Sequence, residues 1–303
     1  MSDLASSVTT PAPLAESRRA TRAAWSRTLI DSFSFWRIRA GFAIVVVIVL
    51  IAFLGPTIAP HSASALVDNP YQGPSSKALL GTDYLGEDVL SRALRGGQSV
   101  VWMSVGAASL ALLLGATVGL TAGYTRTRLD DVLMRMMDVL LALPAIILTL
   151  TVVSLVGPKP WLIVLAVGFS WIPAVARMTR AVTMEVARRE HIQAVEALGM
   201  SPVRICRGEI LPNIITPLMV DYGVRLTWAI GLIAALSFLG AGIQPPRADW
   251  GLMINQNRSG LSLQEWSIIT PVLLIAVYAL GVNLMTEGLA RTAAGIDRKQ
   301  ARS

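Results

Sequence analysis

Apolar residues in this chain gather into six long blocks that are separated by short polar connections. A helix needs roughly 20 apolar residues to cross the ~30 Å hydrocarbon core of a bilayer, and the blocks approach or reach that length. Because irregular backbone finds no hydrogen-bond partners in lipid, such blocks predict membrane helices. The blocks are residues 41–59, 100–124, 136–156, 161–175, 214–243 and 268–289.

The order of these blocks predicts an all-α integral membrane protein with six transmembrane helices and no soluble domain. The polar lead before the first block is too long for a signal peptide, so that block is predicted to be a retained helix. The start of the lead is expected to lack a fixed structure. The predicted units are a tail at 1–40, the first helix at 41–59, a connection at 60–99, a helical core at 100–290 with a polar segment at 185–212, and a tail at 291–303.

Composition supports this class, because 53% of the residues are hydrophobic and only 15% are charged. Soluble domains carry about 25% charged residues. The net charge of +7 is distributed unevenly: 19 lysines and arginines lie in the tails and alternate connections, against 6 in the others. The positive-inside rule then places both tails and residues 185–212 in the cytoplasm and residues 60–99 outside. The basic excess is interpreted as a topology signal, so no nucleic-acid partner is predicted.

Signals for catalysis and cofactor binding are missing from the sequence. Cys206 is the single cysteine, and His61 and His191 are the two histidines, so no metal-ligand set or nucleophile–histidine pair is apparent. No GxxxxGK[ST] phosphate-binding loop occurs. We therefore expect a chain that is not an enzyme and binds neither a metal nor a cofactor.

The polar segment between the fourth and fifth blocks is predicted to fold as a short helix, a tight turn and a second helix. Ile192, Val195 and Leu198 are spaced three apart on one helical face, and Gly199 can adopt the left-handed conformation that ends a helix. Ser201 and Pro202 are suited to the N-cap and first position of the next helix. One interpretation is a loop that lies on lipid headgroups, with its arginines near anionic lipid.

A second interpretation comes from a resemblance of this segment to the cytoplasmic "EAA" loop of ABC importer permeases. Gln193-Ala194-Val195 stands where that family has Glu-Ala-Ala, and Ile210-Leu211-Pro212 closes the motif. The resemblance implies a coupling helix that docks on a separate ATPase. The residues assigned to this coupling loop are Gln193, Ala194, Glu196, Ala197, Gly199, Ile210, Leu211 and Pro212.

Two further segments resemble extracytoplasmic motifs of peptide and nickel permeases. Residues 79–97 are similar to G-T-D-x-x-G-R-D-x-x-S-R, with Glu87 in place of the arginine, and residues 236–253 are similar to L-S-F-L-G-x-G-x-x-P-P-x-x-x-W-G. The resemblance implies an outer rim that faces a binding protein or closes an outer gate. Its residues are Gly81, Thr82, Asp83, Gly86, Asp88, Ser91, Arg92, Pro245, Pro246, Trp250 and Gly251.

Together these motifs resemble the C-type inner-membrane permease subunit of dipeptide and oligopeptide ABC importers. The resemblance implies a type I-like permease fold in a bacterial inner membrane and a second, homologous permease that shares the translocation path. It also implies two ATPase subunits that hold ATP and Mg²⁺, and an extracytoplasmic substrate-binding protein. The same architecture could import nickel, glutathione or another small solute. Alternatives of another class are a stand-alone secondary transporter or channel, and a membrane scaffold.

Charged side chains within apolar blocks are costly and indicate a functional or packing role. Asp221 and Arg225 lie four residues apart, on one face of the fifth block. They are interpreted either as a pair that packs between helices or as a pair that lines the path of a zwitterionic solute.

Overall fold

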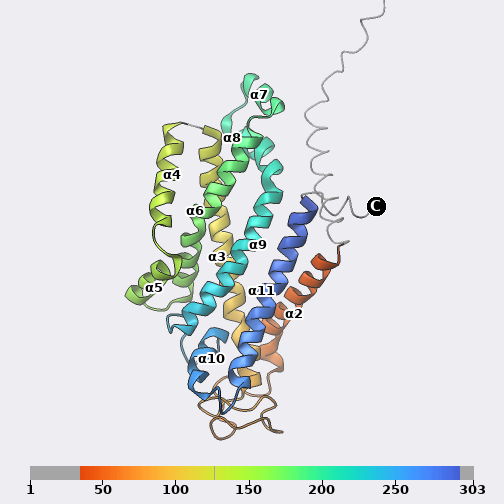
Figure 1. Cartoon of the computed structure of the whole chain (residues 1–303), viewed down its shortest axis with the longest axis vertical. Coiled ribbons are helices and arrows are strands. Elements are labelled where there is room, and N and C mark those ends of the chain that lie inside the picture. The colour runs from red at the N-terminus through yellow and green to blue at the C-terminus, as the bar shows by residue number, and fades with distance from the viewer. Residues whose placement is uncertain (1–34, 126, 294–303) are drawn as a thin grey trace, which may run out of the picture.

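The computed structural model describes residues 35–125 and 127–293, and the expected lack of structure at the start of the chain lies outside these residues. The described part is all-α, as predicted. Its long helices run side by side along the long axis of the molecule (Figure 1). They are α2 (Trp36–Ile58), α3 (Val89–Thr125), α6 (Pro160–Val186), α9 (Leu211–Phe238) and α11 (Trp266–Ala293).

Among the described residues, five helices are long and apolar enough to cross a membrane, with α9 counted together with the short helices before it. The third apolar block is not one straight helix. It divides into α4 (Arg128–Leu141) and α5 (Ala145–Val156), which are bent by 77°. Pro144 lies at the break, where its missing N–H and its restriction of the preceding residue stop a helix. If the bent pair is one span, the total is six.

Several helices extend beyond the apolar blocks. Helix α3 begins at Val89, so the connection after α2 is shorter than residues 60–99. The carboxylate of Asp88 accepts hydrogen bonds from the backbone N–H groups of Leu90 and Ser91, which caps the new helix start. Helix α6 continues to Val186. Apolar blocks mark only the part of a helix that lies in hydrocarbon, so they miss turns that extend into the polar region.

Small residues allow α3 to pack closely against α6. Gly115, Gly119 and Gly123 recur at four-residue intervals on α3. A Cβ atom at Gly119 would lie 2.3 Å from the carbonyl oxygen of Ala176 on α6, which leaves no space for a side chain. Close backbone approach through such a repeat is a recognised way to associate helices in lipid.

The two ends of the bundle differ. One end carries α7 (Glu190–Ala197) and α8 (Pro202–Ile205), at the top of Figure 1. The other carries α10 (Trp250–Asn257), the 3-10 turn η2 (Arg258–Gly260) and the connection between α2 and α3. We call them the α7 end and the α10 end.

Candidate functional site

The polar segment between α6 and α9 forms a helix–turn–helix unit that protrudes at the α7 end (Figure 1). Gly199 has a φ of +79°, as its predicted role at the turn requires. Its N–H donates to the carbonyl of Glu196, and the N–H of Met200 donates to the carbonyl of Val195. This pair of bonds is a Schellman motif, which ends α7 with satisfied carbonyl groups.

Apolar side chains anchor this unit to the membrane helices. Ile192, Ile205 and Ile210 are fully buried in a cluster that also contains Val186 of α6 and Ile214 of α9. The cluster extends to partly buried residues of α3. The unit is therefore packed against three long helices and is not merely tethered at its two ends.

The expected face of Ile192, Val195 and Leu198 is only partly correct. The first two are buried, but Leu198 is 81% exposed. Leu198 follows the last residue of α7, where the chain turns away from the bundle, so the helical spacing no longer applies to it. Val203 on α8 is also largely exposed. The tip thus presents apolar side chains away from the core.

The residues assigned to the EAA-like motif divide into exposed and buried groups. Gln193, Ala194, Glu196 and Ala197 are exposed on α7. The Oε1 atom of Glu196 accepts a hydrogen bond of 3.3 Å from the Tyr124 hydroxyl at the end of α3. This bond adds a polar tie between the protruding unit and the bundle.

The motif's closing residues form the base of the unit. Between α8 and α9 the chain makes a π-helical turn, η1 (Cys206–Ile210), and the N–H of Leu211 donates to the carbonyl of Cys206. Pro212 follows directly and cannot donate a backbone hydrogen bond. A widened turn accommodates the proline ring and joins α8 to α9 without a break.

Side chains of the G-T-D-like segment are mostly buried and hold the loops at the α10 end together. Asp83 Oδ1 accepts from the N–H groups of Leu85 and Glu87, and Asp83 Oδ2 accepts from Arg92 at 2.5 Å. The Arg92 guanidinium also pairs with Glu87. Burial raises the pKa of the Asp83 carboxyl above its usual value, and the charge of Arg92 acts in the opposite direction.

The other predicted rim residues in this segment also have local structural roles. The Thr82 hydroxyl donates to the carbonyl of Asn69 at 2.7 Å, and the Ser91 hydroxyl donates to Asp88 at 2.5 Å. Gly81 and Gly86 occupy turns with φ of +76° and +87°. The segment is thus a compact scaffold.

The two rim motifs meet in space. Trp250 is fully buried against α3, and a Cβ atom at Gly97 would lie 2.4 Å from its ring. Gly251 packs closely on the end of α9, while Pro245 and Pro246 are exposed and joined by a cis peptide bond. The sequence placed both motifs on the same side, and the structure adds this direct contact.

Some residues in this contact were not singled out from the sequence. The amide oxygen of Gln256 accepts from Arg92 at 2.8 Å, and that of Asn257 accepts from the N–H of Tyr84 at 3.0 Å. Asp249 caps α10 through the N–H of Leu252 and accepts from the Ser99 hydroxyl at 2.5 Å. The one local signal for this packing is the adjacent pair Gly96-Gly97, because two glycines on a helix leave room for a large side chain such as that of Trp250.

Asp221 and Arg225 form the predicted pair within α9. The Nη2 atom of Arg225 lies 2.9 Å from Asp221 Oδ1, and its guanidinium stacks over Trp171 of α6, 5.4 Å from the ring centre. Trp228 lies beside Trp171, with 6.0 Å between ring centres. The second oxygen of Asp221 is buried and has no hydrogen-bond partner among the described residues. The pair is therefore held in place, with one acceptor still free.

Other charges at the α7 end join neighbouring helices. Arg180 of α6 donates two hydrogen bonds of 2.6 Å to Asp130 of α4, a pair that the sequence did not indicate. Asp138 pairs with Arg177 at 2.5 Å. Glu287 pairs with Arg37 at 2.6 Å, which links α11 to α2. Within the described residues, no three His, Cys, Asp or Glu side chains lie close enough together to hold a metal ion.

Residues 115–294 match the family model described as the inner membrane component of binding-protein-dependent transport systems. This region includes the helix–turn–helix unit, the Asp221–Arg225 pair and α10.

Curated relatives match most of the chain. A putative peptide transport system permease protein of Brucella suis is 36% identical over 265 residues, which is 87% of this chain and 88% of that protein. The di/tripeptide transport system permease protein DppC of Pseudomonas aeruginosa is 34% identical, over 82% of this chain and 84% of the relative. The glutathione transport system permease protein GsiD of Pectobacterium atrosepticum is 34% identical, over 84% and 88%.

Proposed function

The chain belongs to the inner membrane components of binding-protein-dependent transport systems, and from this premise we propose that it imports di- or oligopeptides. As a member it is a multi-pass protein of the bacterial inner membrane and the non-catalytic subunit of its system. An ATPase and a binding protein complete such a system, and ATP is hydrolysed on the ATPase. This membership rules out the scaffold and stand-alone transporter interpretations.

The peptide assignment rests on relatives that are named for peptide or di/tripeptide transport and match more than four-fifths of this chain. Glutathione is the second candidate, because a permease named for glutathione is equally similar.

The finer assembly in this proposal comprises a second, homologous permease and two ATPase subunits, one beneath each permease. Both termini and the α7 end face the cytoplasm, in agreement with the positive-inside distribution of basic residues. The α10 end then faces the binding protein. The G-T-D-like scaffold and Trp250 form its rigid outer rim.

The observation that carries the mechanism is the packing of the helix–turn–helix unit. Its tip exposes Leu198 and Val203, which an ATPase cleft could cover, while Ile192 and Ile205 fix its base to three long helices. Interiors packed in this way transmit displacement rather than absorb it. Closure of the ATPases on ATP therefore shifts the unit as a rigid body and tilts α3, α6 and α9, which switches access to the path.

The Asp221–Arg225 pair is proposed to line that path. A peptide with free termini carries both signs of charge, and this pair combines a guanidinium with a carboxylate whose buried second oxygen has no hydrogen-bond partner among the described residues. An unpaired charge within the bilayer costs free energy, and pairing with a charge of opposite sign lowers that cost. A paired aspartate and arginine can therefore place both charges within the membrane.

The first test is purification of the tagged chain in mild detergent, followed by mass spectrometry of the proteins that accompany it. Recovery of a second permease and of chains with a GxxxxGK[ST] loop would support the assembly. Uptake of alanine di-, tri- and tetrapeptides and of glutathione into vesicles with this complex would then separate the two candidates. A chain that purifies without an ATPase, even after chemical crosslinking, would contradict the docking role of the loop.

A further inference from the structure

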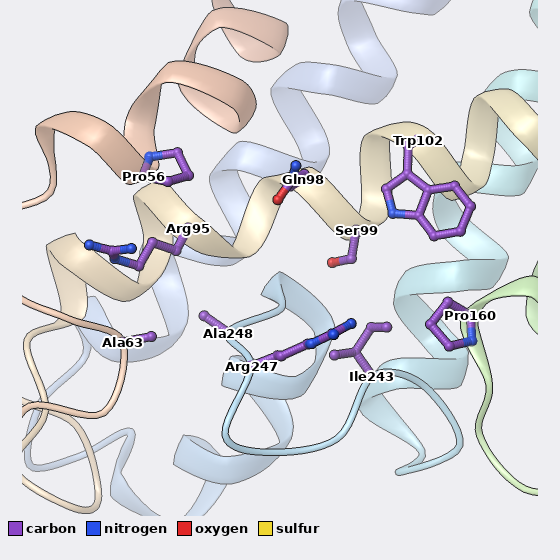
Figure 2. A pocket seen from close by; sticks show the side chains of 10 residues that line it. All are labelled: Pro56, Ala63, Arg95, Gln98, Ser99, Trp102, Pro160, Ile243, Arg247 and Ala248. Atoms are coloured by element: carbon purple, nitrogen blue, oxygen red, sulfur yellow. The ribbon is translucent and has the colours of Figure 1, made fainter.

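A cavity of about 480 Å³ lies at the α10 end, in the size range of small-molecule sites (Figure 2). The first turns of α3 form one wall, and the loop that leads from α9 to α10 faces it. Pro56 at the end of α2 and Pro160 at the start of α6 close the sides. Figure 2 shows the main polar and aromatic side chains: Arg95, Gln98, Ser99 and Trp102 on α3, and Arg247 on the loop.

The two arginines give the cavity an uncompensated positive charge. Neither Arg95 nor Arg247 forms an ion pair with an acid in the part of the chain that the structure describes. Asp249, two residues after Arg247, already accepts from Ser99 and from the N–H of Leu252. Arg95 donates its Nε–H to the carbonyl of His61 at 3.3 Å, which leaves its terminal nitrogens available.

Guanidinium groups bind oxyanions with paired, charge-assisted hydrogen bonds, and they match the planar geometry of a carboxylate. The amide of Gln98 adds a neutral hydrogen-bonding group at the wall, and Trp102 adds an apolar surface. A cavity of this kind is suited to a small solute that carries a carboxylate next to an apolar group.

One face of α3 runs from the cavity toward the Asp221–Arg225 pair. Gln98, Trp102 and Ser109 follow one another on α3 at spacings of four and seven residues, so they share a face. The Ser109 hydroxyl lies 3.3 Å from the hydroxyl of Tyr222, which adjoins Asp221 on α9. This shared face favours the interpretation that the cavity is one binding site along the translocation path rather than an isolated surface pocket.

We propose that this cavity binds the free carboxylate of the transported peptide as the peptide leaves the binding protein. This inference rests on the proposed function. Peptides and glutathione both carry such a carboxylate, so the site would serve either candidate. Arg247 is the principal anchor and Arg95 the second, and the Asp221–Arg225 pair receives the solute deeper in the membrane.

The test uses vesicles that contain the assembled transporter, with alanine di-, tri- and tetrapeptides and the binding protein that stimulates its ATPase. Arg247→Gln removes the anchor, and Arg247→Lys keeps the charge. Arg258→Gln is the matched control, because Arg258 is an exposed arginine at the same end but does not line the cavity.

At saturating loaded binding protein, Arg247→Gln should lower peptide turnover about five- to tenfold, which corresponds to about 1.0–1.4 kcal/mol. This is slightly less than the usual contribution of a hydrogen bond to a charged group, because Arg247 is exposed. Arg247→Lys should retain most of the turnover, and Arg258→Gln should match the wild type. The concentration of binding protein that half-saturates the ATPase should stay unchanged in all variants.

Three results would contradict the proposal that this cavity binds the peptide carboxylate. Equal turnover in Arg247→Gln and wild type would mean that the cavity holds no transported group. A raised half-saturating concentration of binding protein with normal turnover would mean that the arginine contacts the binding protein instead. Phospholipid that co-purifies with wild type and not with Arg247→Gln would assign the cavity to a headgroup phosphate. Failure of the wild type to take up any peptide, despite a stimulated ATPase, would instead contradict the proposed function.

Discussion

The indole N–H of Trp250 donates a hydrogen bond of 2.7 Å to the carbonyl oxygen of Ala93, across 157 positions of the sequence. The bond joins α10 to the first turns of α3. It fixes a fully buried tryptophan in a slot that glycine residues leave open on α3. The α10 end is consequently one packed unit.

Gly97→Ala should destabilise this unit. The added Cβ would lie 2.4 Å from the Trp250 ring, and overpacking of this kind costs about 1–3 kcal/mol. Thermal unfolding of the purified complex in detergent measures the loss. Gly73→Ala is the control, because no atom lies within 4 Å of its Cβ position. Equal melting temperatures for the two variants would show that the slot is not tightly filled.

Gly199→Leu should uncouple ATP hydrolysis from uptake. The φ of +79° costs a non-glycine residue about 1–2 kcal/mol, while no atom lies within 4 Å of the new Cβ, so the turn shifts without a core clash. The measurement is the ratio of peptide taken up to ATP hydrolysed.

Gly199→Asn should keep that ratio near the wild-type value, because asparagine tolerates the left-handed conformation. Gly231→Leu is the second control, since this helical glycine also has open space around its Cβ position. Wild-type coupling in Gly199→Leu would remove the coupling interpretation of the turn.

Leu198→Asp should weaken ATPase binding and leave folding intact. The side chain is 81% exposed, so its replacement should change the free energy of unfolding by about 0.5 kcal/mol or less. The amount of ATPase that co-purifies with the tagged chain reports the effect. Leu263→Asp is the matched control, because Leu263 is also largely exposed but lies at the α10 end. If both variants retain the ATPase equally, the tip of the unit is not the docking surface.

Asp221→Ala should reduce expression and assembly, because it leaves the Arg225 guanidinium without its carboxylate inside the bundle. Loss of one member of a buried pair costs about 3–5 kcal/mol. The double variant Asp221→Ala with Arg225→Leu should recover part of the yield and remain inactive in uptake if the pair contacts the solute. Normal expression and uptake in Asp221→Ala alone would contradict both roles.

Local sequence signals predicted the helices and the turn at Gly199, because both depend on neighbouring residues. Apolar blocks of membrane length gave the spans, and the glycine gave the positive φ. The 77° bend within the third block was not predicted, although Pro144 lies at it. A proline in an apolar block is compatible with a kink, a break or a helix start, and packing decides among them.

Contacts between residues that lie far apart in the sequence could not be predicted from such local signals. The rim motifs were recognised, but their contact through Trp250 and Gly97 was not, nor was the Arg92–Gln256 bond. The exposure of Leu198 was missed because helical spacing assumes that the helix continues. The cavity around Arg247 depends on how the loop folds back toward α3, which no local pattern records.

The glycine repeat of α3 has a mechanical consequence. Because Gly115, Gly119 and Gly123 lie backbone against backbone with α6, neither helix can slide or rotate far without a steric clash. The two helices are therefore expected to move together, and one end of the pair carries the helix–turn–helix unit while the other end borders the arginine cavity. If ATPases dock on the helix–turn–helix unit as proposed, their closure would also move the wall of the arginine cavity at the opposite end of the bundle.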